Sequence, residues 1–380
     1  MTYLYRRPVY RRLLIASQVM NFLHWILLAP CVCTAQFLVL HSSCSSTGNC
    51  SAQLQKLLSA CSHGVASGCA INFVPYAATF RLEQTRAVEI SGITGLALEG
   101  NGAQILLRGN SPFIRVYNCS EIFIKNLTLI ADRSPFTLGT VAESLNGKVT
   151  LKVDTARYPL HDEWTHEVVA MHEIDGIHLT PKIGGLDWIF KPNGGLPWER
   201  ILLKVLAKPR SNNSSMTRVS FVDQGFGLVP GTAVVLRHTI EFSRPKLDSI
   251  VLQTSRNVSL IDLTIHHSPG MAVLAHDCTD LHFERIVNKP SSDSTPLAGN
   301  ADAIHIASCR GHVVVRDCVA DRQGDDGINI HSQYGVVTSV ASRNCSGQHS
   351  VQLQVGPHMN ADNTSWGNIF ARLALCVVMH

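Results

Sequence analysis

The sequence predicts an all-β protein, a parallel β-helix interrupted by an inserted antiparallel β-domain. Three observations predict this fold. Short alternating segments recur along the chain, at steps that begin in the low twenties of residues. Between Leu129 and Leu252 the recurrence stops and unmatched strand-like runs take its place. The stretch Asn300–Tyr334 then contains one acidic strand twice. Coils that cannot bury an apolar face alone must stack, which is typical of a solenoid.

The composition is that of a folded protein. The chain has 380 residues, of which 45% are hydrophobic and 16% charged, so it can bury a large core. The net charge is only +4, and the basic residues are scattered apart from an N-terminal group, Arg6, Arg7, Arg11 and Arg12. Nothing in this distribution indicates a surface that binds nucleic acid.

Residues 1–35 are predicted to be a signal peptide. The basic group precedes an apolar run, Leu13–Val32, and the small residues that follow suit cleavage after Ala35. An uncleaved signal anchor is the alternative, although three polar residues interrupt the run and disfavour a stable span: Gln18, Asn21 and His24. Cleavage predicts a protein of the secretory pathway or the cell exterior, without membrane attachment.

Cysteines and sequons agree with secretion from a eukaryotic cell. Four of the twelve cysteines lie close together and could staple, as disulfides, an N-terminal cap within residues 36–130: Cys44, Cys50, Cys61 and Cys69. Eight Asn-x-Ser/Thr sequons predict a glycoprotein: Asn49, Asn118, Asn126, Asn212, Asn213, Asn257, Asn344 and Asn363.

Five segments can be aligned as copies of one strand. They are Ile93–Gly100, Cys119–Leu127, Ser255–Leu263, Cys278–Ile286 and, with one extra residue, Cys309–Cys318. The step is 23 residues from 255 to 278 and 31 from 278 to 309, and a polar loop, Lys289–Gly299, explains the longer step. Cys278 and Cys309 therefore share a register. A buried column of small residues is favoured at this register, with a disulfide between coils as the alternative.

Residues 131–250 are predicted to be an inserted β-domain, with long irregular coils as the alternative. Four strand-like runs are separated by turn residues, as in antiparallel hairpins or a small barrel: Val149–Val153, His166–Met171, Ile201–Leu206 and Thr232–Arg237. The β-helix is then expected to resume over 251–367 and to carry the active site. Residues 368–380 do not resemble a coil, so we expect a truncated sequence.

The repeated acidic strand predicts a column of carboxylates. Asp302–Ile306 returns 24 residues later as Asp326–Ile330. A coil rises by one strand spacing, about 4.7–4.9 Å, so Asp302 should lie beside Asp325 and Asp326, and His305 beside Asn329. His331 falls on the same outward face. Alternation places four isoleucines in the core: Ile304, Ile306, Ile328 and Ile330.

Three neighbouring carboxylates suit the hydrolysis of a glycosidic bond. Two like charges ~4 Å apart repel by about 1 kcal/mol in water and by several times more in a shielded cleft. The repulsion raises the pKa of one acid, which can then donate a proton while the others activate water. Aspartates also form turns and bind calcium, and these remain alternatives. We predict that His305, Asn329 and His331 bind the substrate, and we predict no metal or other cofactor.

The motifs of this region resemble a known enzyme family. Ser268–Leu274, Ala301–His305, Cys309–Gly311 and Asp325–His331 resemble, in this order, the α-1,3-galactosidases of glycoside hydrolase family 110. Those enzymes remove terminal galactose from blood-group-B-type glycans. Weaker similarity extends back to about Ser91. Polygalacturonase-like β-helices also carry an aspartate followed one coil later by an Asp-Asp pair.

The resemblance implies a right-handed, pectin-lyase-like β-helix with inserted β-barrel material. It also implies exo-acting, metal-independent hydrolysis with inversion at a terminal α-galactose, performed by Asp302, Asp325 and Asp326. We assign Asp302 as the general acid and the Asp325–Asp326 pair to the attacking water, with the opposite assignment as the alternative.

Two other functions stay open at the level of sequence. A polygalacturonase-like pectin hydrolase would need a basic groove, and the basic residues near the acid column are Arg310, Arg316 and Arg322. An inactive glycan-binding β-helix is the second alternative, because the chain stops about 50 residues after Asp326 whereas family members continue with further coils. The loop Ser291–Asn300 also lacks the arginine expected near a sugar. The sequence does not select an oligomeric state.

Overall fold

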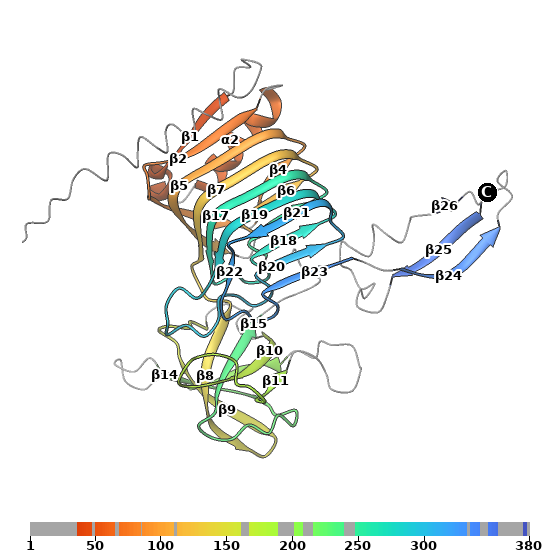
Figure 1. The fold of residues 1–380 in the computed structure, drawn as a ribbon. Coiled ribbons are helices and arrows are strands. Elements are labelled where there is room, and N and C mark those ends of the chain that lie inside the picture. The colour runs from red at the N-terminus through yellow and green to blue at the C-terminus, as the bar shows by residue number, and fades with distance from the viewer. Residues whose placement is uncertain are drawn as a thin grey trace, which may run out of the picture.

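The computed structural model is a stack of parallel coils with an antiparallel sheet looped out of one side (Figure 1). It describes residues 36–47, 50–64, 68–84, 86–109, 112–160, 167–188, 201–207, 216–238, 248–332, 335–342, 349–355 and 375–377. The predicted fold class, an all-β parallel β-helix, is confirmed. The segment 1–35 and most of 368–380 lie outside the described residues. Within the described part of the chain, no helix combines the length and apolarity needed to cross a membrane.

Two parallel sheets form the walls of the coils. The long-strand sheet has the order β1 (Gln36–His41), β2 (Cys69–Val74), β5 (Thr94–Gly109), β7 (Ser120–Ala131), β17 (Arg256–His266), β19 (Thr279–Asn288) and β21 (Arg310–Arg316), with β3 (Thr79–Gln84) on β5 and β22 (Val319–Ala320) on β19. The short-strand sheet has the order β4 (Val88–Ser91), β6 (Ile114–Tyr117), β16 (Ile250–Gln253), β18 (Val273–His276), β20 (Ile304–Ala307) and β23 (Ile328–His331). One continuous apolar core fills the space between them.

The coils bend at the same places because left-handed residues recur in register. One such residue, with φ of 50–65°, precedes each long strand: Gly92, Asn118, Thr254, Asp277 and Ser308. A second column lies within those strands, at Asn126, Asp262, Arg285 and Asp317. Asn, Asp and Gly tolerate this conformation better than other residues, which explains why they predominate at these positions. The turns therefore fix where each coil changes direction.

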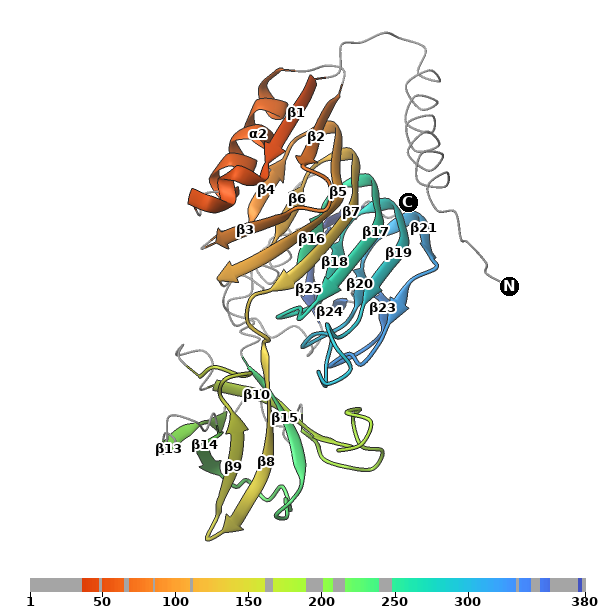
Figure 2. The ribbon, with the colours of Figure 1, turned by 90° about the vertical axis from the view of Figure 1, so that its left-hand side faces the viewer.

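An N-terminal cap covers the first coil. The 3₁₀ helix Ser42–Thr47 and the helix α2 (Cys50–Gly64) lie against β1, β3 and β4 (Figure 2). Leu54 and Leu58 of α2 are buried in the coil core. Disulfides Cys44–Cys50 and Cys61–Cys69 join the cap to itself and to β2.

The antiparallel sheet lies between β7 and β16 in the sequence and has its own core. Its strand order is β11 (Asp187–Trp188), β10 (Glu167–Ile174), β15 (Ala233–His238), β8 (Phe136–Leu145), β9 (Lys148–Asp154), β14 (Met216–Val222) and β13 (Lys204–Ala207), with β12 (Ile201–Leu202) on β10. Phe136, Leu151 and Leu236 are among its buried residues, and Leu297 from the loop after β19 joins them. The coils resume in register, because β16 pairs with β6 and β17 with β7. We call this unit the inserted sheet.

The observed pairing agrees with the aligned copies. Thr94, Ser120, Arg256, Thr279 and Arg310 stack in one register, each one residue after the start of its aligned segment. The extra residue of the last copy produces a register shift between Thr279 and Leu281. Cys278 and Cys309 are both free thiols, with the Cys278 amide 3.4 Å from the Cys309 sulfur, so the alternative of a disulfide between coils is not realised in the structure.

Two expectations about the last coil were wrong. Ile304 and Ile306 are buried, but Ile328 and Ile330 are 48% and 63% exposed, because no described coil stacks on β23. The β-helix was expected to continue to residue 367, yet β24 (Gly335–Ser342), β25 (His349–Val355) and β26 (Leu375–Val377) pair antiparallel in a separate sheet. Only six residues separate β24 from β25 in sequence. Such a connection permits an antiparallel pair but is too short for a parallel crossover.

Two isoleucines in one register test the position of the last coil. Ile306 and Ile330 are partners on β20 and β23, with exposed fractions of 1% and 63%. We expect Ile306→Ala to lower the free energy of unfolding by about 2–5 kcal/mol, because it leaves a cavity in the core. Ile330→Ala should change it by only about 0.5 kcal/mol. Urea unfolding measures both, and equal losses would show that Ile330 is covered in solution.

Candidate active site

The structure brings the three predicted aspartates together at the edge of the short-strand sheet. Asp302 lies two residues before β20, and Asp325 and Asp326 lie just before β23. Each offers a carboxylate oxygen, and the three oxygens lie within 4.8 Å of one another. The Ala303 amide donates to the Asp326 carbonyl over 3.1 Å, so the pairing of the coils itself sets this approach. Asp302 is only 4% exposed, whereas Asp325 and Asp326 are exposed.

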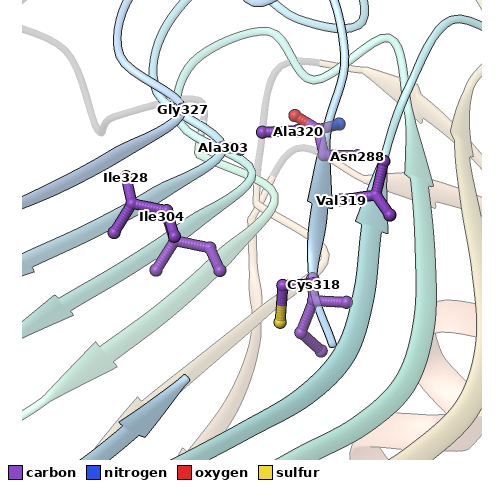
Figure 3. Close-up of a pocket in the computed structure, with 9 residues that line it drawn as sticks. Asn288, Ala303, Ile304, Cys318, Val319, Ala320, Gly327 and Ile328 are labelled. Carbon is purple, nitrogen blue, oxygen red and sulfur yellow. The ribbon is translucent and has the colours of Figure 1, made fainter. Parts of the chain in front are cut away.

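A shallow pocket on the inner side of the same strands is a different place (Figure 3). Its lining includes Ile304, Ile328, Cys318 and Val319, which belong to the apolar interior at the open end of the coils. Ala303 and Gly327 separate this interior from the carboxylates in sequence and also line the pocket. Its apolar walls do not suit a sugar hydroxyl, so the outer, carboxylate-bearing face is the candidate site.

The three predicted substrate-binding residues adjoin the carboxylates. His305 Nδ1 lies 2.5 Å from Asp302 Oδ2, and its Nε2 lies 2.9 Å from His331 Nε2. Asn329 donates from Nδ2 to Asp326 over 3.0 Å. A neutral His305 that donates from Nδ1 must accept at Nε2, so His331 is then the donor in their contact. His305 and Asn329 therefore orient Asp302 and Asp326 respectively, which leaves His331 the most exposed of the three towards a ligand.

Electrostatics distinguish Asp325 from its neighbours. Loss of hydration raises the pKa of the Asp325 carboxyl above its usual range, and the Asp302 carboxylate raises it further. Solvent reaches the side chain, but enough protein surrounds the carboxyl for desolvation to be the largest cause. Asp326 adds to the rise, while the Arg237 guanidinium opposes it. Of the three acids, Asp325 is therefore the one for which the surroundings favour the protonated form.

Sequence reasoning missed the basic residue that matters most at this site. Arg237, on β15 of the inserted sheet, is 2% exposed and donates from NH1 to the Gly324 carbonyl over 2.6 Å. The arginines closer in sequence are paired elsewhere: Arg310 with Asp277, Arg316 with Glu284, and Arg322 with the Asp293 and Thr295 carbonyls. No motif signals Arg237, because 87 residues separate it from Gly324.

The same three carboxylates could also hold a hard divalent cation. Calcium takes six to eight oxygen ligands, and three carboxylates within 4.8 Å supply part of such a shell. The nearby groups that complete the site are His305 and Asn329, which already bond to Asp302 and Asp326. A cation would displace or compete with these donors, so the donor set fits a water and a sugar better than an ion.

Comparison with curated proteins agrees with the resemblance seen in the sequence. Alpha-1,3-galactosidase A of Shewanella woodyi is 33% identical over 283 residues, which cover 68% of this chain and 42% of that protein. Alpha-1,3-galactosidase B of Akkermansia muciniphila is 25% identical over 287 residues, covering 71% and 33%. The chain is a relative of the α-1,3-galactosidases. It spans about a third to two fifths of the length of these galactosidases.

A second family matches the part that contains the acids. The family model "Glycosyl hydrolases family 28" matches residues 238–365, which include Arg237's neighbour His238 and all three aspartates. Among solved structures, the chain is similar to Jun a 1, the major allergen from cedar pollen, with a TM-score of 0.29 and 10% identity over 73% of this chain and 48% of that one. Both galactosidase and family 28 similarities thus cover the last four coils.

The raised pKa of Asp325 predicts how stability depends on pH. A carboxyl whose folded pKa lies above its unfolded pKa contributes stability below the unfolded value and loses it as pH rises through the folded value. Asp325→Asn removes this ionisation. We therefore expect the variant to gain stability relative to the parent as pH rises from about 3 to 7, measured by the midpoint of thermal unfolding. Asp293→Asn, an exposed loop substitution, is the control, and parallel pH curves for parent and Asp325→Asn would contradict the assignment.

Proposed function

We propose that this protein is a glycoside hydrolase that releases terminal α-1,3-linked galactose from glycans, acting from the chain end. The observation that carries the proposal is the convergence of Asp302, Asp325 and Asp326 within 4.8 Å on one outward face. Proton donation and water activation need carboxyl groups in different ionisation states, and this cluster supplies them. The printed names of the relatives support galactose as the sugar and α-1,3 as the linkage.

The electrostatics favour Asp325 as the general acid, the reverse of our sequence-based assignment. A general acid must be protonated near the working pH, and Asp325 has the raised pKa. Asp302 and Asp326 then hold the attacking water. Their oxygens are at most 4.8 Å apart, and two hydrogen bonds of about 2.7 Å span up to ~5.4 Å, so one water can donate to both. His305 and Asn329 keep these two carboxylates in place.

We propose inversion of configuration, which the resemblance implies. The close spacing of the oxygens is nearer the ~5 Å typical of retaining glycosidases than the roughly 6.5–9.5 Å of inverting ones. Three carboxylates change this comparison, because Asp325 can protonate the leaving oxygen while the other two share one water. Direct displacement by that water needs no covalent glycosyl-enzyme. The first-formed galactose anomer, observed by proton NMR, decides: β-galactose supports inversion, and α-galactose contradicts it.

A polygalacturonase-like activity is the second candidate, and the family 28 match favours it. Such an enzyme needs free basic groups to bind an acidic polymer. The arginines expected to provide them, Arg310, Arg316 and Arg322, bond to carboxylates or carbonyls of the protein, and Arg237 is buried. A neutral sugar therefore suits the described face better. Hydrolysis of polygalacturonate but not of an α-1,3-galactoside would establish this second candidate. Binding of an α-1,3-galactoside without turnover would instead support the inactive glycan-binding reading.

Substitution of each acid separates its role. Asp325→Asn should reduce kcat on an α-1,3-linked galactose disaccharide by about 10²–10⁴-fold, because proton donation to the leaving oxygen is lost. The loss should be much smaller on 4-nitrophenyl α-galactoside, whose leaving group departs without protonation. Asp302→Asn and Asp326→Asn should reduce kcat on both substrates, because water activation is needed for each. Galactose release is measured at matched protein stability. Equal losses for Asp325→Asn on the two substrates would contradict its role as the acid.

Chelation tests whether the carboxylates work through a cation. We expect incubation with EDTA, followed by removal of the chelator, to leave kcat and KM unchanged, because all three carboxylates have roles that need no metal. Added Ca²⁺ should not activate and, at high concentration, should inhibit by occupying the acids. Loss of activity with EDTA that Ca²⁺ restores would overturn this mechanism.

We also propose that the protein acts in the secretory pathway or outside the cell. Disulfides Cys44–Cys50 and Cys61–Cys69 support this location, because disulfides persist in oxidising compartments.

A further inference from the structure

Arg237 connects the inserted sheet to the turn that carries the acids. It is the last residue but one of β15, and its side chain is 2% exposed. Its NH1 donates to the Gly324 carbonyl over 2.6 Å, and Gly324 directly precedes Asp325 in sequence. The same NH1 lies 3.1 Å from His172 Nε2 on β10, which must accept because a guanidinium has only donors. Two strands of the inserted sheet therefore support one bond to the catalytic turn.

The turn itself has little freedom to adjust. The Gly324 amide donates to the Gly299 carbonyl over 3.1 Å, and a Cβ on Gly324 would lie 2.7 Å from the Asn300 carbonyl oxygen. Asn300 is fully buried and donates to the Pro135 and His238 carbonyls, 2.9 Å each. The residues before Asp302 and before Asp325 are thus both fastened to the inserted sheet, on either side of β8 and β15. A displacement of Arg237 would pass directly to Asp325.

The charges around the turn explain why a cation is needed there. Asp325 faces Asp302 and Asp326, which both oppose its ionisation, and Arg237, which favours it. His305 contacts Asp302, Asn329 contacts Asp326, and His172 lies behind Arg237. Burial makes Arg237 effective, because a fixed positive charge away from water interacts more strongly with a carboxylate than a solvated one. Arginine also keeps its charge throughout the accessible pH range.

We propose that Arg237 is a positioning residue of the active site, through which the inserted sheet fixes the Gly324–Asp325 turn and places a permanent positive charge beside the three carboxylates. The inference rests on the proposed function and deepens it. It makes the inserted sheet a part of the catalytic apparatus, in addition to any contact it has with glycans. The electrostatic part has a definite sign: removing the guanidinium should raise the pKa of Asp325 further.

Kinetics of Arg237 variants test the inference. We expect Arg237→Met to lower kcat on the α-1,3-linked disaccharide by roughly 10–100-fold, because Asp325 loses its support. The alkaline limb of the kcat profile should move to higher pH, because Asp325 stays protonated longer. Arg237→Lys should keep the parent's alkaline limb, because it retains the charge, while losing part of kcat. Added guanidinium ion should restore part of the activity of Arg237→Met. Arg218→Met removes one exposed positive charge from the same inserted sheet and should leave both kcat and the profile unchanged.

A titration that needs no activity separates this inference from the proposed function. With ¹³C-labelled aspartate carboxyls, the Asp325 resonance is identified by its absence in Asp325→Asn. Its titration midpoint should be higher in Arg237→Met than in the parent, and unchanged in Arg218→Met. If Arg237→Met does not fold, Arg237→Gln takes its place. An unchanged midpoint overturns the inference whether or not the protein is active. An inactive parent with a shifted midpoint overturns the proposed function alone.

Discussion

The stacking of equivalent residues at one strand spacing is the constraint on which the whole structure depends. Each parallel coil places a residue about 4.8 Å from its counterpart on the next coil. Columns that face inward are therefore apolar, as in the register of Leu98, Ile124, Leu260 and Phe283. Outward columns pair opposite charges on neighbouring coils, as in Glu99 with Lys125 and Glu284 with Arg316. The left-handed turns are repeated in register for the same reason.

This constraint makes a column of like charges costly, and the active site is built on one. Asp302 and Asp326 occupy the same register on successive coils, and Asp325 lies beside them. The neighbouring coils supply His305 and Asn329 as direct partners of two of these acids. The third acid has no such side-chain donor among its printed contacts and instead feels the Arg237 cation from outside the coils. Unequal partners give the three carboxyls unequal proton affinities, which general acid–base chemistry requires.

The insertion is compatible with this regularity because it leaves and re-enters at one coil. β7 and β17 pair as if no residues lay between them, and so do β6 and β16. The register of the acids is therefore independent of the inserted sheet, but their surroundings are not. Asn300 and Arg237 cross the junction in opposite directions within a few residues of the acids. An insertion of this kind can alter a site chemically without altering the scaffold that aligns it.

The sequence by itself determined the coils and their register. The period of the aligned segments, including the extra residue near Gly311, identified which residues stack, because a parallel β-helix converts sequence spacing directly into distance. It also identified the three acids and their neighbours, since these lie 24 residues apart in one repeat. Only the tertiary structure decided what depends on contacts between distant segments. Ile328 and Ile330 follow the buried pattern but are exposed, because burial needs a neighbouring coil and not only alternation. Arg237 acts on Asp325 although the local sequence gives no sign of it, because the fold of the inserted sheet brings β15 to the turn. Local periodicity encodes register, whereas the ionisation of a buried group depends on every charge that folding brings near it.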